Sequence, residues 1–121
     1  MLLLVAMAML ADIQAADYFP MYEGQTVKTR ALVQPYFDCA FYAAGKMERS
    51  GDAPNEVAKA AMTVCDDDRA DLQASIDADL ALAPSEPETG LSDKVMNKLD
   101  TWMAGHLQMR IVAKRAIRAG N

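Results

Sequence analysis

Apolar side chains recur three or four residues apart in three stretches of the chain, the spacing that places them on one face of an α-helix. In residues 26–47 this face carries Leu32, Val33, Tyr36, Ala40, Ala43 and Met47. In the stretch that ends near residue 82 it carries Val57, Ala61, Val64, Cys65, Leu72, Ile76 and Leu80. In residues 93–119 it carries Val95, Leu99, Trp102, Met103, His106, Met109, Ala113 and Ile117. Because β-branched residues are also sparse, the sequence predicts an all-α protein.

Proline and glycine mark where these helices break. Pro35 removes a backbone hydrogen bond inside the first helix, so we expect either a kink or, as we favour, a second segment that begins at Pro35. Gly51 suits the left-handed conformation that ends many helices. Asp52 is placed to cap the next helix, which has Pro54 in its first turn. The pattern therefore predicts an antiparallel helical hairpin over residues 26–82.

In two other segments the apolar residues have no regular spacing. Residues 83–92 contain two prolines and a glycine, which is typical of a linker, and Ser92 is expected to cap the amphipathic helix over residues 93–119. Residues 16–25 are predicted to form a loosely structured leader whose aromatic side chains could dock on the core. Because a two-helix hairpin leaves its apolar faces exposed, we expect the helix over 93–119 to pack on it and complete a small three-helix bundle.

The two cysteines, Cys39 and Cys65, each lie 13 residues from Asp52. Two antiparallel helices of equal rise bring such residues to the same height, about 20 Å from the turn. Both cysteines also belong to the apolar faces, so the sequence predicts a disulfide between Cys39 and Cys65. Two buried free thiols are the alternative.

An uncharged apolar run, from Leu2 to Leu10, opens the chain and is followed by small residues at Ala15 and Ala16. This order is typical of a secretory signal peptide over residues 1–15, with cleavage after Ala15 or, as the alternative, after Ala11. The run is about half the roughly 20 residues that a transmembrane helix needs. No Lys or Arg precedes it, which leaves open a buried or amphipathic N-terminal helix in a cytosolic protein. We expect export to an oxidising compartment, periplasmic or extracellular.

Charge is unevenly distributed along the chain. The formal net charge is −5 at pH 7, which disfavours a nucleic-acid partner. Residues 48–88 hold 11 acidic and 3 basic side chains, whereas residues 92–121 hold 2 acidic and 6 basic ones. We expect these two regions to attract each other, within one molecule or between two.

The segment from Tyr36 to Leu72 combines a C-x25-C spacing, a Gly-Asp-Ala-Pro turn and the run VAKAAMTVC that ends at the second cysteine. In these features it resembles small exported proteobacterial proteins with a two-cysteine helical hairpin. The resemblance covers about a third of the chain. It implies export and the hairpin, but no activity.

Four carboxylates, Asp66, Asp67, Asp68 and Asp71, form a candidate cation site. On a continuous helix consecutive side chains point about 100° apart, so neighbours cannot converge on one ion. The calcium-loop pattern also fails, because Asp71 stands where that loop needs its glycine and Asp77 where it needs its glutamate. We predict a solvated acidic face, which could instead dock the basic end of the third helix.

His106, the only histidine, lies between Met103 and Met109 on the third apolar face. Such a row could hold Cu(I), because thioether sulfur is a soft ligand, so a periplasmic metal-handling protein is an alternative function. Core packing is the simpler interpretation, since methionines at helical spacing usually fill a core. We therefore predict no metal site and no cofactor.

No set of residues predicts catalysis. Both cysteines are used in the bridge, and Ser50, Ser75, Ser85 and Ser92 lack a Gly-x-Ser-x-Gly context. The third helix, with Trp102 and flanking cations, could lie on an anionic bilayer or grip a partner helix. We expect a non-enzymatic exported protein with an interaction or structural role. Its partner would be another envelope protein or a second copy, with membrane-surface association as an alternative.

Overall fold

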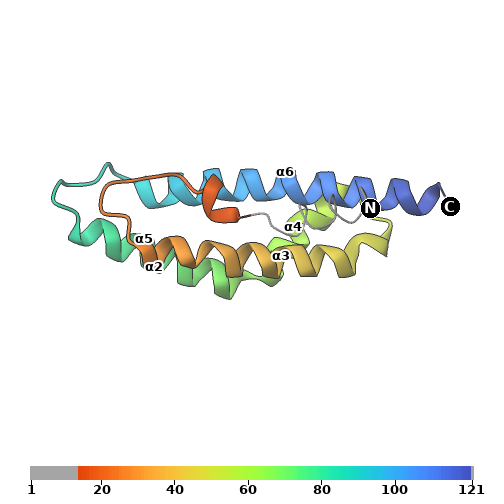
Figure 1. The fold of residues 1–121 in the computed structure, drawn as a ribbon, viewed down its shortest axis with the longest axis horizontal. Helices are drawn as coiled ribbons and strands as arrows, with labels where there is room; N and C mark the ends of the chain where they lie inside the picture. Colours follow the sequence, from red (N-terminus) through yellow and green to blue (C-terminus); the bar gives the residue numbers. More distant parts are fainter. Residues whose placement is uncertain (1–13, 121) are drawn as a thin grey trace, which may run out of the picture.

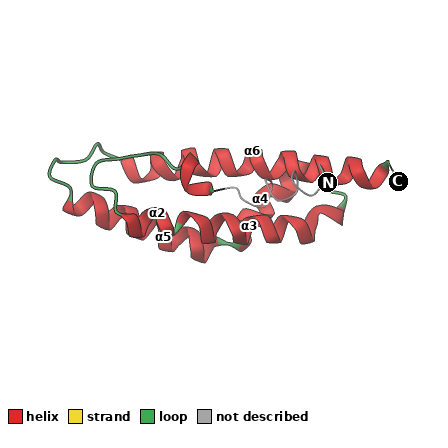
Figure 2. Ribbon diagram, in the orientation of Figure 1, coloured by secondary structure: helices red, strands yellow, loops and turns green. Residues whose placement is uncertain are grey.

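The computed structural model describes residues 14–120, and these are almost entirely helical (Figures 1 and 2). Within that range there is no β-strand, so the predicted all-α class is confirmed. The expected signal peptide lies outside the described residues except for Gln14 and Ala15.

The helices form three rods that lie along one another (Figure 1). A short 3-10 helix, η1 (Ala15–Tyr18), precedes the first rod, which consists of α2 (Val27–Ala31) and α3 (Val33–Met47). The 3-10 turn η2 (Glu48–Ser50) leads into the second rod, which consists of α4 (Pro54–Val64) and α5 (Asp66–Leu82). The third rod is the single helix α6 (Leu91–Ala119), and it contacts α3, α4 and α5.

The first rod is interrupted at Leu32, whose N–H donates to the carbonyls of Thr29 and Arg30. Pro35 lies in the first turn of α3, where a missing backbone N–H costs no helical hydrogen bond. The two segments that we favoured are therefore present, but the second begins at Val33 rather than at Pro35.

The second rod is interrupted at Cys65, which has φ −101° and ψ 26° and donates its N–H to the carbonyls of Met62 and Thr63. The continuous helix predicted from Pro54 to about Leu82 is therefore two helices. Periodicity could not reveal this break, because the buried apolar positions continue across a single non-helical residue without changing their spacing.

The turns between the rods are made by glycine and backbone geometry rather than by side-chain caps. Gly51 has φ +83° and Gly90 has φ +76°, the left-handed region that favours glycine. The residue before α4 is Ala53, so Asp52 does not cap that helix, although Pro54 occupies its first position as predicted. Ser92 likewise lies inside α6 and is not its cap.

One continuous apolar core fills the space between the rods. Its largest fully buried side chains include Tyr36 of α3, Leu72 and Ile76 of α5, and Leu99 of α6. The part of α6 that carries Leu99 contributes to this core and contacts α3, α4 and α5. Burial of this apolar surface is the main favourable term in holding the rods together.

The segment before α2 is also fixed to the rods. Ala15 and Phe19 are buried in the core, and the Tyr22 hydroxyl donates to Asp79 Oδ2 at 2.7 Å. The segment over residues 16–25 thus includes most of η1 and makes contacts with the core and with α5. Its aromatic side chains do dock on the core, because the rods leave an apolar surface that they cover.

Candidate interaction surface

The predicted disulfide is present. Cys39, in the middle of α3, is bonded to Cys65 with 6.0 Å between their α-carbons, and no cysteine among the described residues is free. The bond joins the first rod to the break in the second. It is a structural link and leaves neither sulfur available as a nucleophile.

The apolar face predicted for the C-terminal helix divides in two in the structure. Val95, Leu99 and Met103 are buried at 0–3% exposure, as expected. Met109 and Ile117, from the same predicted face, are 73% and 70% exposed. The helix therefore carries its C-terminal apolar residues on a surface that no other part of the described chain covers.

Helix geometry explains the division. Apart from Met96, the buried residues of α6 follow steps of four, through Val95, Leu99, Met103, Leu107 and Ile111. Each step of four residues turns about 40° beyond one full turn, so the buried line winds around the helix as it crosses its neighbours. The straight face predicted from the sequence coincides with the buried line as far as Met103 and diverges from it by Met109, which is exposed.

We define the outer stripe as the exposed apolar residues of α6 at successive turns: Met109, Val112, Ala113, Ala116 and Ile117. At about 100° per residue, Trp102 and His106 fall on the same side of the helix. Between residues 102 and 117 this side of α6 carries no Asp, Glu, Lys or Arg. The outer stripe is therefore continuous and uncharged along several turns.

Aromatic rings form the N-terminal end of this surface. Tyr18 stacks on Trp102 with 4.3 Å between ring centroids, and Trp102 stacks on His106 at 5.4 Å. Phe37 lies against both Trp102 and His106 at 5.5 and 5.6 Å. Tyr18 nevertheless remains 55% exposed, so the cluster is open to solvent on one side.

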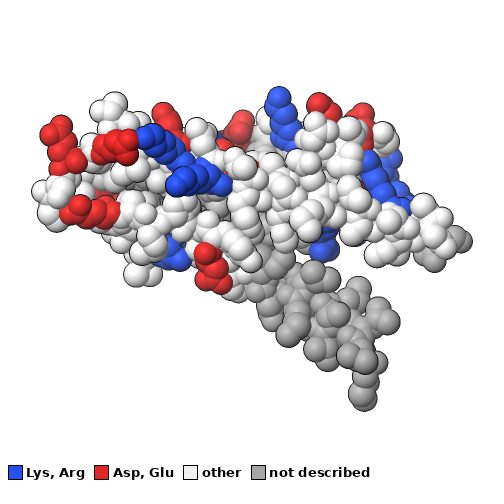
Figure 3. Space-filling view, turned by 90° about the horizontal axis from the view of Figure 1, so that it is seen from above, with Lys and Arg blue, Asp and Glu red and all other residues white. Residues whose placement is uncertain are grey.

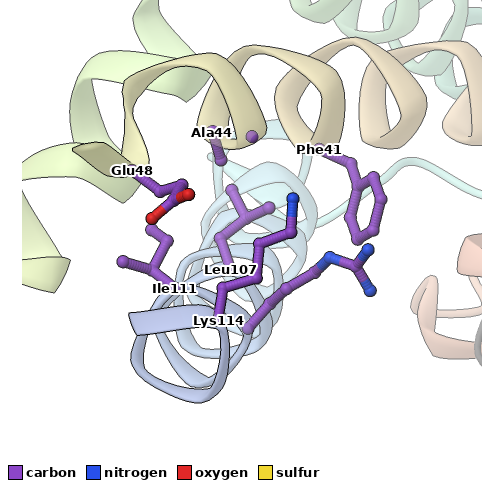
Figure 4. Close-up of a pocket in the computed structure, with 8 residues that line it drawn as sticks. Phe41, Ala44, Glu48, Leu107, Ile111 and Lys114 are labelled. Atoms are coloured by element: carbon purple, nitrogen blue, oxygen red, sulfur yellow. The ribbon is translucent and has the colours of Figure 1, made fainter. Parts of the chain in front are cut away.

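Cations flank the outer stripe. Residues 101–121 contain four basic residues and no acidic one. Arg110 lies 3.9 Å from the ring centre of Phe41, and Lys114 extends over the shallow hollow between α3 and α6 (Figure 4). Seen from the α6 side, much of the surface in the middle of the molecule is uncharged, and both acidic and basic groups lie toward each end (Figure 3).

The remaining two cations hold the end of α6 in place. Arg115 donates to the backbone carbonyls of Glu48 at 2.8 Å and Asp52 at 2.6 Å. Arg118 forms an ion pair with the buried carboxylate of Glu48. The acidic middle and the basic end of the sequence therefore meet within one molecule, at Glu48 rather than at the aspartate cluster.

The residues of the predicted acidic face do not converge on a common point. Asp66, Asp67 and Asp68 occupy the first turn of α5, where carboxylates interact favourably with the helix dipole. Asp66, Asp67, Asp71 and Asp77 are all exposed. The break at Cys65 thus explains the cluster, because it creates a new helix N-terminus that the sequence pattern did not reveal.

The structure does not bring the Met103, His106 and Met109 side chains into one site. Met103 is fully buried in the core, whereas Met109 is 73% exposed. His106 lies among aromatic rings, and burial, together with the nearby charge of Arg110, lowers its pKa. Among residues 14–120 no group of three or more His, Cys, Asp or Glu side chains is arranged to hold a metal ion.

Sequence reasoning missed a polar cluster at the bottom of a groove between α4 and α6. Tyr36 donates its hydroxyl to Asp100 Oδ1 at 2.9 Å, and Arg69 contacts Asp100 Oδ2 through Nε at 3.0 Å and Nη2 at 2.8 Å. Burial, and then the charge of Asp100, raises the pKa of Tyr36. The groove has a volume of about 410 Å³ and is edged by Lys59 and Thr101.

It also missed a buried carboxylate at the other end of the molecule. Asp79 accepts hydrogen bonds from the Thr29 hydroxyl at 2.6 Å, the Tyr22 hydroxyl at 2.7 Å, and the Thr26 hydroxyl and N–H at 2.9 and 3.2 Å. Burial raises the pKa of this carboxyl, but the hydrogen bonds outweigh burial and lower it. The cluster fixes the segment before α2 to α5.

Comparison with protein families, curated proteins and solved structures gives no match to this chain. Nor does any helix within residues 14–120 have the length and apolar character needed to cross a bilayer.

Proposed function

We propose that this is an exported, non-enzymatic protein that works by presenting a contact surface to a component of the cell envelope. In this proposal the disulfide-linked rods form a helical hairpin, and α6 completes a small three-helix bundle that displays the outer stripe. The observation that carries the proposal is the exposure of Met109, Val112 and Ile117 on one face of α6.

Single exposed apolar residues are ordinary on protein surfaces. The outer stripe differs because its members follow one another at helical spacing without an intervening charge on that side of the helix. Contiguous apolar surface edged by polar groups is typical of an interaction site. The cations beside the stripe add a preference for a partner that carries negative charge.

The disulfide supports export, because such bonds form and persist in oxidising compartments. The environment of Ala15 bears on where a signal peptide would be cleaved. Its N–H donates to Gln34 Oε1 at 2.9 Å, and its side chain is fully buried. Cleavage after Ala11, the alternative position, would keep this contact, whereas cleavage after Ala15 would remove it.

Site-specific photo-crosslinking in a Gram-negative cell tests the contact surface. A photoreactive amino acid at position 109, on the outer stripe, is compared with one at position 77, on the exposed face of α5. We expect crosslinked products from position 109 and none from position 77. Equal products from both positions, or none from position 109, would contradict the proposal.

The same material tests export. Intact mass should show a chain that has lost its first residues and that is lighter by two hydrogen atoms than the reduced form. A full-length chain with two free thiols would rule out export.

A further inference from the structure

We infer that the outer stripe is the face with which the protein lies on an anionic lipid surface. The inference rests on the proposed function and names the partner of the contact surface defined there. It is carried by the exposed apolar line on α6, by Arg110 and Lys114 along one side of it and by the aromatic pair at its N-terminal end.

The shape of the outer stripe suits a flat partner. From Trp102 to Ile117 the uncharged side of α6 extends about 22 Å along a single straight helix. Because α6 forms one long side of the molecule, this line can lie parallel to a surface while the other rods face away (Figure 1). An amphipathic helix bound in this way inserts its apolar face at the boundary between headgroups and acyl chains.

The aromatic pair fits the same arrangement. Tyr18 and Trp102 are stacked on each other, and Tyr18 is exposed whereas Trp102 is half-buried. Tyrosine and tryptophan favour the interface between hydrocarbon and water, because each combines an apolar ring with a polar group. The pair therefore lies where a bound helix needs an interfacial anchor.

The charges select an anionic surface. At about 100° per residue, Arg110 and Lys114 lie along one side of the outer stripe. Arg115 and Arg118 are instead engaged by Glu48 and Asp52. Residues 101–121 include no carboxylate side chain that would be repelled by anionic headgroups. Long basic side chains beside an apolar stripe can extend toward phosphate groups while their alkyl parts stay against the apolar region.

The same charges disfavour a second copy of the chain as the occupant. Two α6 helices paired along their outer stripes would bring Arg110 and Lys114 of each copy to the edge of the contact, with no carboxylate side chain of residues 101–121 to pair with them. Like charges at close range would weaken such a pair. An acidic groove on a partner protein is the other outcome that the test must separate.

Vesicle flotation with the full exported chain tests the inference. The vesicles contain either phosphatidylcholine alone or phosphatidylcholine with about 30% phosphatidylglycerol. We expect the protein to float with the anionic vesicles at low salt, to stay behind with neutral ones, and to be released at high salt. The single tryptophan, Trp102, should show a blue-shifted emission only with the anionic vesicles.

The variants Met109→Asp and Ile117→Asp place a carboxylate in the outer stripe at positions that are 73% and 70% exposed, so folding should be retained. Each should reduce flotation by about tenfold or more. Val64→Asp is the matched control, because Val64 is 63% exposed on α4 and lies outside the stripe. Lys114→Gln should weaken binding to anionic vesicles by a smaller factor and make binding less dependent on salt.

Three outcomes would overturn the inference: the protein does not float with anionic vesicles, it floats equally with neutral ones, or Val64→Asp reduces flotation as much as the outer-stripe variants do. If the protein does not float with anionic vesicles but position 109 still crosslinks to a protein, the lipid inference is wrong and the proposed function stands. If crosslinking from position 109 also fails, both are wrong. A dimer in sedimentation that Met109→Asp converts to a monomer would identify a second copy as the occupant instead.

Discussion

Cys39 is covalently bonded to Cys65, the single residue that separates α4 from α5. The disulfide therefore joins the first rod to the second at the point where the second rod loses its helical hydrogen bonding. Cys65 itself is buried at 2% exposure, whereas its neighbours Val64 and Asp66 are exposed, so the bond lies on the inner side of the break. The link closes a loop with a sequence separation of 26 residues.

Loss of the disulfide should substantially destabilise the protein. For a loop of this size, the reduced conformational entropy of the unfolded chain corresponds to about 3.5 kcal/mol. We expect the double variant Cys39→Ala/Cys65→Ala to lose about this much free energy of unfolding in urea titrations. Wild-type protein kept in a reductant should behave like the variant, and equal stability of the oxidised and reduced wild type would contradict the prediction.

Asp79→Asn should destabilise the protein although it changes few atoms. An amide offers one acceptor oxygen and two donors where Asp79 accepts four hydrogen bonds, so donors of Thr29 and Tyr22 would lose a partner. We expect a loss of about 2–3 kcal/mol in the free energy of unfolding. Tyr22→Phe should cost less, about 1 kcal/mol, since the other donors remain. Tyr42→Phe, at a side chain that is 66% exposed, is the control.

The contribution of Asp79 should also depend on pH. Its hydrogen bonds lower the pKa of the folded carboxyl below the unfolded value of about 3.9. The stability gained from the ionised form is therefore present above about pH 4 and is lost as the pH falls through the folded pKa. The difference in stability between wild type and Asp79→Asn should shrink in acid below about pH 4, and a constant difference would argue against this role.

Much of the fold could be predicted from local signals. Gly51 and Pro54 mark a turn, because glycine permits a left-handed backbone and proline restricts φ. Cys39 and Cys65 are equidistant from that turn. These features depend on residues close in sequence or on simple helix geometry. The break at Cys65 could not be predicted, because one non-helical residue leaves the spacing of apolar residues unchanged.

The outer stripe and the polar clusters required the tertiary structure. Met109 and Ile117 have the spacing of core residues, and only the winding of the buried line around α6 shows that they face solvent. Asp79 and Thr29 are 50 residues apart, and no local pattern indicates that a carboxylate and a hydroxyl will be buried together. Polar residues that form hydrogen bonds with residues distant in the sequence produce no periodic pattern in it.

The Arg69–Asp100 pair should make a measurable contribution to stability. Both Arg69 contacts reach Asp100 Oδ2, and the two side chains are 31% and 23% exposed, so solvent screens them only in part. A double-mutant cycle with Arg69→Ala and Asp100→Ala should give a coupling energy of about 1 kcal/mol. A cycle on Lys94 and Glu88, an exposed pair, should give a weaker coupling that salt abolishes. Equal coupling in the two cycles would contradict this ranking.

Arg115 should control the order of the last turns of α6. Arg115→Ala removes the hydrogen bonds to the carbonyls of Glu48 and Asp52 that fix this end of the helix to η2. The free energy needed for local opening should fall by about 1–2 kcal/mol. This change corresponds to roughly tenfold faster amide exchange after residue 111. Lys114→Ala, at an exposed neighbouring residue, should leave exchange unchanged. Slow exchange in Arg115→Ala would show that the Arg115 hydrogen bonds do not control this end, which the Arg118–Glu48 ion pair also holds.

His106 should titrate below its usual range, because burial and the charge of Arg110 both disfavour the protonated ring and lower its pKa. As the pH falls, His106 therefore becomes protonated in the unfolded chain before it does in the folded protein. The free energy of unfolding should decrease as the pH drops from about 6.5 through the folded pKa. Arg110→Gln should raise the pKa of His106 in NMR titrations but leave it below 6.5, since burial among Phe37 and Trp102 persists. Lys98→Gln, two turns away on α6, is the control. A wild-type pKa at or above 6.5 would mean that the ring is solvated rather than packed against the aromatic cluster beside the outer stripe.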